Sequence, residues 1–331
     1  MSGYLVGMDE AGYGPNLGPL VVSATVWQVP GDPRDADLYN LLRDVVTSAP
    51  ERREMAVPSE NGADPARARL LLADSKVVYK PAHGLADLEL GLLSALAWAG
   101  LRPKTWRGLW DAVDADGFAR VESLPWHDGY DRELACDSVV IDRRAAALRA
   151  GADAVGVRLV SVRSRSVFPE QWNENLDRHQ NKSTVLSLVT LDLLGEVLAA
   201  LDGGPIHVTC DKHGGRDRYR PLVQRRLTDA LVETNCEGRE ESRYGWGRGE
   251  GRVEVSFCAK AERYLPVALA SMASKYLREL SMDAFNCFWR RQVPGLAATA
   301  GYPLDAVRFK SDIAPAQQRL GIDDHILWRE R

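Results

Sequence analysis

Apolar runs and apolar helical repeats follow one another along this chain and predict alternating strands and helices. Residues 4–8 form an almost continuous apolar run, which is typical of a strand in a sheet covered on both faces. Residues 20–29 are rich in valine and predict a second strand, which Gly18-Pro19 turns back against the first. β-Branched residues predict further strands over 155–167, 206–210 and 252–257. The strand over 155–167 carries Arg163 and Arg165, so we expect it to begin buried and to end in solvent.

Three stretches have the apolar spacing of helices. The predicted helix over 85–99 is closed by Gly100, and the strongest repeat, over 182–201, is stopped by Gly203. A third helix, over 266–280, opens on a proline, which suits a first helical turn.

Two further stretches interrupt this pattern. Residues 30–67 are rich in proline and glycine, and we expect one short helix over 36–46 followed by a flexible tail. Residues 101–150 contain Trp106, Trp110 and Trp126. These tryptophans belong either to a helical lid or, on the simpler interpretation, to a local core. We treat both stretches as insertions into a single domain that covers residues 1–331.

Acidic residues stand where predicted strands end. The first strand stops on Asp9-Glu10, the strand over 206–210 stops on Asp211, and Glu279 lies on a late helix. Adjacent carboxylates repel one another unless a cation neutralises them. Gly12 and Gly14 follow at once and expose backbone amides that a ligand can approach. The pattern indicates a metal site beside a phosphate or a sugar, and the alternative is a solvated hairpin with a glycine-rich turn.

Composition narrows the class of protein. The chain has 331 residues, 45% of them hydrophobic and 27% charged, which allows a sizeable core. Its net charge of -4 means that any nucleic-acid contact must use local basic patches, such as the arginine-rich residues 212–226. The five cysteines are far apart and form no C-x-x-C pair, which argues against a zinc site or a disulfide framework and favours a cytoplasmic location. No apolar run reaches the length of a membrane span. The histidines are interpreted as surface or core residues and not as metal ligands.

The motifs resemble those of type 2 ribonuclease H (ribonuclease HII). Residues 9–22 match its opening signature, Asp-Glu-Ala-Gly-x-Gly-Pro-x-x-Gly-Pro-x-Val-Val, almost position for position. Residues 73–76 are similar to its Asp-Ser-Lys motif, and Asp211 falls where a strand-ending Asp sits in the family. The helix that begins near Asn181 resembles the family's central helix, and residues 270–279 resemble its Ala-Ser-x-x-Ala-Lys-x-x-Arg-Asp block. All of these motifs occur in the family's order.

The resemblance implies a fold, an activity and a site. The fold is α/β and ribonuclease H-like, with a central mixed sheet flanked by helices. The activity is endonucleolytic cleavage of the RNA strand of RNA–DNA hybrids, or cleavage at ribonucleotides embedded in DNA, with two Mg²⁺ or Mn²⁺ ions. The implied catalytic metal ligands are Asp9, Glu10, Asp211 and Glu279, and the implied substrate-binding residues are Gly12, Tyr13, Gly14, Ser75, Lys76, Ser271, Lys275, Arg278 and Tyr302. The expected partner is nucleic acid, with no membrane, and the expected state is a monomer.

This chain also departs from the family pattern. Tyr13 stands where the family has Arg between two glycines, Glu279 replaces Asp, and only Gly301-Tyr302 remains of the family's closing motif. Three alternatives therefore stay open. The first is a nuclease of the same fold that acts on other DNA or RNA structures. The second is an inactive nucleic-acid-binding relative, and the third is a purely structural protein.

Overall fold

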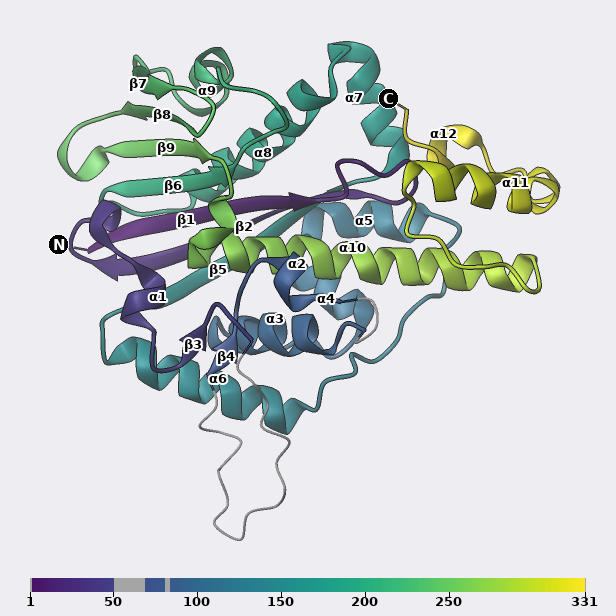
Figure 1. Ribbon diagram of the computed structural model, residues 1–331, viewed down its shortest axis with the longest axis horizontal. Coiled ribbons are helices and arrows are strands. Elements are labelled where there is room, and N and C mark those ends of the chain that lie inside the picture. Colours follow the sequence, from purple (N-terminus) through teal and green to yellow (C-terminus); the bar gives the residue numbers. More distant parts are fainter. Residues whose placement is uncertain (1, 51–68, 81–83, 331) are drawn as a thin grey trace, which may run out of the picture.

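A seven-stranded mixed sheet forms the centre of the protein in a computed structural model, which describes residues 2–50, 69–80 and 84–330 (Figure 1). Its strand order is β5-β2-β1-β6-β9-β8-β7. The strands are β1 (Ser2–Ala11), β2 (Leu20–Pro30), β5 (Arg158–Val167), β6 (Ile206–Asp211), β7 (Glu233–Glu237), β8 (Glu241–Trp246) and β9 (Val253–Cys258). β1, β6 and β9 run parallel, and the other neighbours pair antiparallel. The predicted α/β fold with a central mixed sheet is confirmed.

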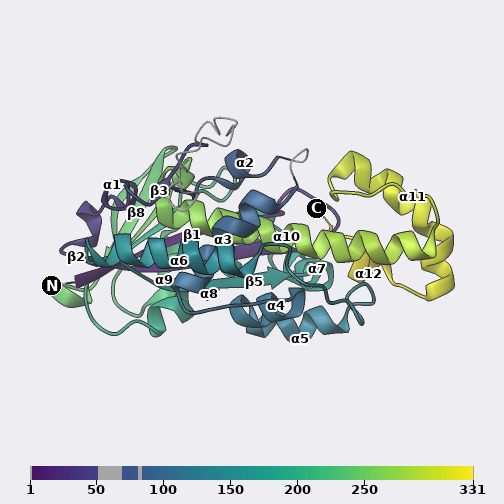
Figure 2. The same ribbon diagram turned by 90° about the horizontal axis from the view of Figure 1, so that it is seen from below.

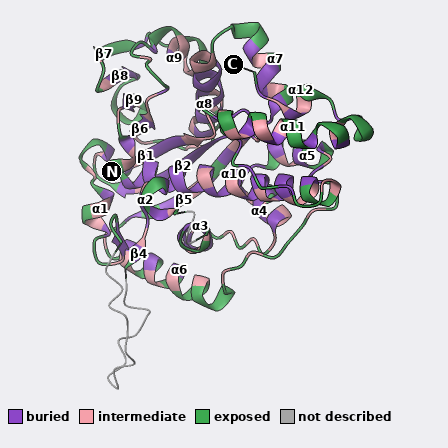
Figure 3. Cartoon of the chain, turned by 45° about the vertical axis from the view of Figure 1, so that its right-hand side comes forward, coloured by how far each residue is buried: buried purple, intermediate pink, exposed green. Residues whose placement is uncertain are grey.

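Helices cover both faces of the sheet, as predicted. On one face lie α3 (Ala86–Trp98), α6 (Ser138–Asp153) and the long α10 (Leu265–Gln292), and on the other lie α8 (Lys182–Ala199) and α9 (Arg220–Leu227) (Figures 1 and 2). Side chains of β1 point alternately to the two faces. Leu5 packs into the core on the first face, and Val6 packs into the core on the second. The central strands are therefore buried, as Figure 3 shows.

Helix α10 starts directly on the sheet because β1 has a glycine there. A Cβ atom on Gly7 would lie 2.1 Å from the carbonyl carbon of Pro266. The Thr25 hydroxyl donates to the Pro266 carbonyl oxygen at 2.7 Å and fixes the same contact. The predicted helix over 266–280 is therefore present, and it continues to Gln292.

The first insertion is less helical than predicted. It contains η1 (Pro33–Asp35), α1 (Leu38–Leu41) and β3 (Val46–Thr47), which pairs with β4 (Leu70–Leu71). The Asp37 carboxylate caps the short helix, which ends at Leu41 before the chain enters β3. The prediction of a helix over 36–46 is wrong in extent, and most of the predicted flexible tail lies outside the described residues.

The second insertion is built into the core. It forms α4 (Trp106–Val113), α5 (Ala115–Ser123) and most of α6. Trp106, Trp110 and Trp126 are all buried, and the indole N–H of Trp106 donates to the Leu280 carbonyl oxygen of α10 at 3.2 Å. The interpretation of these tryptophans as local core is confirmed.

Strand β5 differs from its prediction at its second half. Its pairing with β2 shifts between Val26 and Trp27, which face Ser161 and Leu159 respectively. This bulge changes which residues face the core, so that Leu159 and then Val162 are both buried there. The strand ends buried at Val167 and not in solvent, and the prediction of a wet end is wrong.

Several helices had no predicted counterpart. They are α2 (Ser75–Val78), α7 (Pro169–His179), α9, α11 (Pro303–Leu320) and α12 (Asp324–Leu327), with short helices η4 (Gly249–Gly251) and η5 (Ala261–Arg263). After α12 the chain returns to lie against α7, where its C-terminal end is seen in Figure 1. Within the described ranges, no helix is long and apolar enough to span a membrane.

Candidate active site

Two acidic strand ends meet at one edge of the sheet. In the parallel pairing of β1 with β6, Met8 lies opposite Cys210, so Asp9 and Asp211 follow on neighbouring strands. Glu10 is the next residue of β1. Asp9 and Asp211 therefore lie at the carboxyl ends of adjacent parallel strands. Ligands of open α/β sheets bind at such an edge.

A further carboxylate, which the sequence analysis missed, joins this group. Glu262 lies in η5, just beyond the end of the third parallel strand, β9. The N–H of its neighbour Ala261 donates to the Asp211 carboxylate at 3.1 Å. The Glu262 carboxylate itself lies 3.1 Å from the Lys76 ammonium. Its position after the predicted strand over 252–257 was the only signal that could have identified it.

Burial and mutual repulsion disfavour the charged forms of these acids. Burial raises the pKa of Asp9 well above its ordinary value, with Glu10, Asp211 and Glu262 adding to the effect and the Ser271 hydroxyl opposing it. Burial and Asp211 raise the pKa of Glu10 to about 8, although Lys76 pulls it down. Burial also raises the pKa of Asp211. A cation placed among these groups would favour their charged forms.

The donor atoms suit a hard divalent cation. Asp9, Glu10, Asp211 and Glu262 offer carboxylate oxygens, which Mg²⁺ and Mn²⁺ prefer, and the neighbouring thiols of Cys210 and Cys258 are buried. Among the described residues, however, no three Asp, Glu, His or Cys side chains are arranged to hold an ion together. The residues fit such an ion chemically, and the carboxylates would have to draw closer when it binds.

Glu279 has other partners. Its carboxylate lies 2.5 Å from the Lys275 ammonium and 3.7 Å from the Arg278 guanidinium, and the Tyr79 hydroxyl donates to it at 3.4 Å. Lys275 also lies over the Tyr79 ring at 4.5 Å. Glu279 and Lys275 therefore neutralise each other on one helical turn, and their predicted roles at the metal and the phosphate stay predictions.

Two serine hydroxyl groups of α10 fasten this helix to the site. The Ser271 hydroxyl donates to the Ser75 hydroxyl at 3.0 Å and so joins α10 to α2, which carries Lys76. The Ser274 hydroxyl lies 3.0 Å from the Asp9 carbonyl oxygen and 2.8 Å from the Ser23 hydroxyl. Ser75 and Ser271 therefore link α2 to α10, and the Ser271 hydroxyl also hydrogen-bonds the Asp9 carboxyl group. The Lys76 side chain is paired with Glu262 and is 78% exposed at its outer side.

The glycine loop after β1 is held from beneath. Gly12 has φ +92°, and a Cβ atom there would lie 2.4 Å from the Pro19 carbonyl oxygen and 2.7 Å from Nε of Arg278. Arg278 is buried and donates to the carbonyl oxygens of Leu17 and Ala300. It supports the loop from inside, and its predicted contact with a phosphate stays a prediction.

Tyr13 and Gly14 form the outer part of this loop. The Tyr13 ring meets the ring of Trp172, on α7, edge to face at 6.4 Å, and its hydroxyl faces Gly214. Tyr13 thus packs on α7. Gly14 is exposed, and Tyr302, which caps α11, is 55% exposed.

The basic residues 212–226 are mostly engaged within the protein. Lys212, Arg216 and Arg226 contact Asp217, Thr184 and Asp192 respectively. Arg165 of β5 likewise pairs with Glu196 at 2.6 Å. Arg218 is 87% exposed, so it is the member of this segment best placed to meet a ligand.

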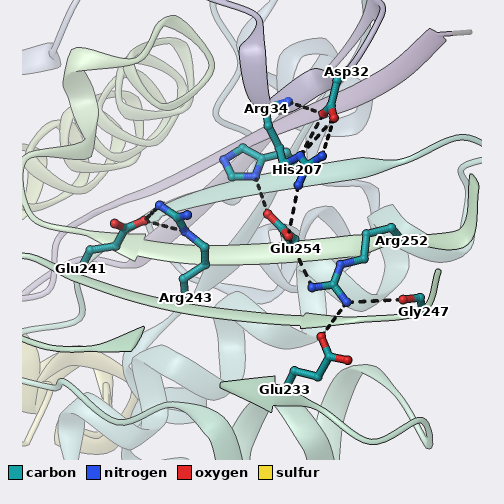
Figure 4. Close-up of polar contacts among 9 residues, drawn as sticks. All are labelled: Asp32, Arg34, His207, Glu233, Glu241, Arg243, Gly247, Arg252 and Glu254. Carbon is teal, nitrogen blue, oxygen red and sulfur yellow. Dashed lines mark hydrogen bonds and ion pairs between the residues drawn. The ribbon is translucent and has the colours of Figure 1, made fainter. Parts of the chain in front are cut away.

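A separate cavity of about 460 Å³ lies over β6 and β9, beside the start of α10. Figure 4 shows the buried Glu254 between His207, Arg34 and Arg252, at 4.0, 3.8 and 3.4 Å. None of the three strand-end acids lines this cavity. The ion pair between Arg34 of η1 and Glu254 of β9 holds η1 against the sheet.

Comparison with known proteins gives structural likeness only. No family model matches this chain, and no curated protein matches it in sequence. The crystal structure of ribonuclease H2 from Pyrococcus horikoshii OT3 is 16% identical, with a TM-score of 0.43 over 98% of this chain and 92% of that one. A chain of the PCNA:RNase HII complex from Archaeoglobus fulgidus is 14% identical, with a TM-score of 0.40 over 99% and 94%. Bst-RNase HIII in complex with Mn²⁺ is 14% identical, with a TM-score of 0.41 over 99% and 66%. Such low scores leave the activity of this chain to the chemistry of its own site.

Proposed function

We propose that this protein is a metal-dependent endonuclease of the ribonuclease H type. Its substrate would be the RNA strand of RNA–DNA hybrids or a ribonucleotide embedded in DNA. The observation that carries the proposal is the meeting of Asp9, Glu10 and Asp211 at the carboxyl ends of β1 and β6. We further propose that the chain acts as a monomer with a single domain of the ribonuclease HII kind.

Asp9, Glu10 and Asp211 would hold the metal ions, with Glu262 beside them. Two Mg²⁺ or Mn²⁺ ions would supply the charge that activates water and stabilises the leaving oxygen. The carboxylates would bring this charge to the meeting ends of β1 and β6. Ala261 keeps Asp211 oriented through its N–H, and Ser274 keeps the β1 backbone at Asp9 against α10.

The residues around the acids would bind the substrate strand. Lys76, beside Glu262, would meet a backbone phosphate, and the exposed Tyr302 would lie against a sugar. The glycine loop at Gly12 and Gly14 would lie along the minor groove, where the 2′-hydroxyl distinguishes RNA from DNA. Ser75 and Ser271 would place Lys76 relative to Asp9.

A cleavage assay with three substrates tests this function. The substrates are an RNA–DNA hybrid, a DNA duplex with a single ribonucleotide, and an all-DNA duplex of the same sequence. We expect Mg²⁺- or Mn²⁺-dependent cleavage of at least one ribonucleotide-containing substrate and no cleavage of all-DNA. Equal cleavage of all three would favour a nuclease of different specificity, and cleavage of none would favour an inactive binding protein.

A further inference from the structure

Arg329, near the C-terminal end of the chain, lies beneath the glycine loop. Its side chain is buried, with 1% of the residue exposed. The guanidinium donates to the carbonyl oxygen of Gly12 at 2.5 Å and to that of Tyr13 at 3.2 Å. Its central carbon lies 4.3 Å from the ring centre of Trp172. Arg329 thus binds two successive carbonyl groups of the loop that adjoins the acidic residues.

The chain around Arg329 is fixed on both sides. The Arg329 N–H donates to the Asn16 carbonyl oxygen at 2.8 Å, and the Asn16 side-chain amide donates to the Arg329 carbonyl oxygen at 2.9 Å. On α7, Trp172 donates to the Glu330 carbonyl oxygen, and Asn173 exchanges hydrogen bonds with Trp328 and Glu330. This segment is therefore built to deliver the guanidinium to one place.

These hydrogen bonds also set the direction of two amide groups. In a trans peptide the N–H points away from the C=O of the same unit. Because Arg329 binds the carbonyl groups of Gly12 and Tyr13, the N–H groups of Tyr13 and Gly14 point away from it. Successive N–H groups of this kind form a concave site that suits an anion. Gly14 is exposed, so an anion can reach them.

The positive charge under the loop is not compensated. Within the described ranges, no carboxylate lies within 4.0 Å of the Arg329 guanidinium, and its buried Nε has no partner. The buried Nε of Arg278 has none either, and the acid nearest to Arg278, Glu279, is closer to Lys275. Burial and Arg278 lower the pKa of Arg329 to about 9. Buried cations without counter-charges are costly, so an anion above the loop would be favoured.

We infer that Arg329 is a positioning residue for a backbone phosphate of the bound strand. It holds the Tyr13 and Gly14 amides outward as the phosphate site, and with Arg278 it supplies the charge that the phosphate neutralises. This inference rests on the proposed function in one respect, that the ligand is a nucleic acid. Arg329 thus supplies a guanidinium group to this loop, in which residue 13 is a tyrosine and not an arginine.

Binding measured in an uncleaving background tests this role. The parent is the Asp9→Asn protein, into which Arg329→Met and Arg329→Lys are introduced. Arg319→Met, at an exposed position of α11, is the matched control for the loss of one charge. We measure the dissociation constant for a single-ribonucleotide duplex between 50 and 300 mM salt, together with the melting temperature of each protein.

We expect Arg329→Met to weaken binding at least tenfold at low salt and to reduce the salt slope by about one. Arg329→Lys keeps the charge and should fall between the parent and the Met variant, and Arg319→Met should stay within twofold of the parent. A folded Arg329→Met variant with parental affinity and slope would overturn the inference. So would a Lys variant as weak as the Met variant, because charge would then not matter.

A second measurement begins with the Asp9→Asn parent alone and is then repeated in Arg329→Met. Single methylphosphonate linkages, which are uncharged, are placed one at a time around the ribonucleotide, and binding to the Asp9→Asn parent is measured. We expect one position to weaken binding at least tenfold, and to have little further effect in Arg329→Met. If no single position matters, the inference is wrong. Lack of cleavage by the wild type with binding intact would contradict the proposed function alone.

Discussion

Met8 on β1 lies opposite Cys210 on β6 in parallel register, so each strand delivers an aspartate to the same edge of the sheet. Asp9 is buried there, with Glu10 beside it and Glu262 close enough to raise its pKa. The arrangement concentrates negative charge at a place where burial already disfavours it.

Glu262 is predicted to matter more than Glu279. Its charge raises the pKa of Asp9, Glu10 and Asp211, whereas Glu279 is neutralised by Lys275. We expect Glu262→Gln to lower the single-turnover rate of cleavage about 100-fold and Glu279→Gln to lower it less than tenfold. Single-turnover kinetics at saturating Mg²⁺ measure both. The reverse order would mean that Glu279 leaves Lys275 and becomes the fourth metal ligand.

Asp9→Asn is predicted to stabilise the metal-free protein while abolishing cleavage. Replacing a buried carboxylate by an amide removes repulsion with Glu10 and Asp211. The melting temperature in EDTA should therefore rise. Added Mg²⁺ should raise the melting temperature of the wild type and much less that of the variant, because the ion binds only the folded wild-type site. Equal metal stabilisation of both proteins would place the ion elsewhere.

Tyr13→Arg is predicted to tighten substrate binding. A phenol offers one hydrogen bond, whereas a guanidinium can pair with a phosphate through two charged N–H donors. The ring of Tyr13 packs on Trp172, so Tyr13→Ala should loosen the loop and weaken binding. Equilibrium binding and single-turnover cleavage separate the two effects. If Tyr13→Ala changes neither quantity, or Tyr13→Arg removes activity, the loop serves a different substrate.

Acid sensitivity is predicted from His127. This side chain is buried in the second insertion among Trp106, Trp126 and Phe168, and burial lowers its pKa from 6.5 to about 3. Between pH 3 and 6.5 His127 carries a proton in the unfolded chain but not in the folded chain. His127 therefore leaves the free energy of unfolding unchanged above pH 6.5 and lowers it as pH falls toward 3. The loss is about 1.4 kcal/mol per pH unit for one proton.

His127→Gln removes that titration. Urea unfolding of the wild type and of His127→Gln between pH 4 and 7 measures the difference in their slopes. Carboxyl groups with raised pKa values stabilise the folded state as pH falls, but they do so equally in both proteins. Parallel pH profiles would show that His127 is already charged when folded.

The sequence alone was sufficient to predict the site residues that stand at the ends of strands. Asp9 and Asp211 could be predicted because each ends a short apolar run, and a parallel register brings such ends together. Glu262 could not, because η5 has no periodic pattern and owes its position to the end of β9. Arg329 could not either, since its contact with Gly12 joins residues 317 positions apart. The bulge in β5 and the early end of α1 at Leu41 depend on pairing and capping, which local apolar patterns do not record.

The most direct test of the account is the Mg²⁺ dependence of cleavage at a single ribonucleotide by the wild type, Asp211→Asn and the exposed-site control Arg319→Met. We predict that the wild type and the control cleave 5′ or 3′ of that ribonucleotide with the same dependence on Mg²⁺, and that Asp211→Asn, although folded, is inactive at every concentration. Cleavage by Asp211→Asn near the wild-type rate would contradict the claim that the meeting ends of β1 and β6 form the catalytic centre.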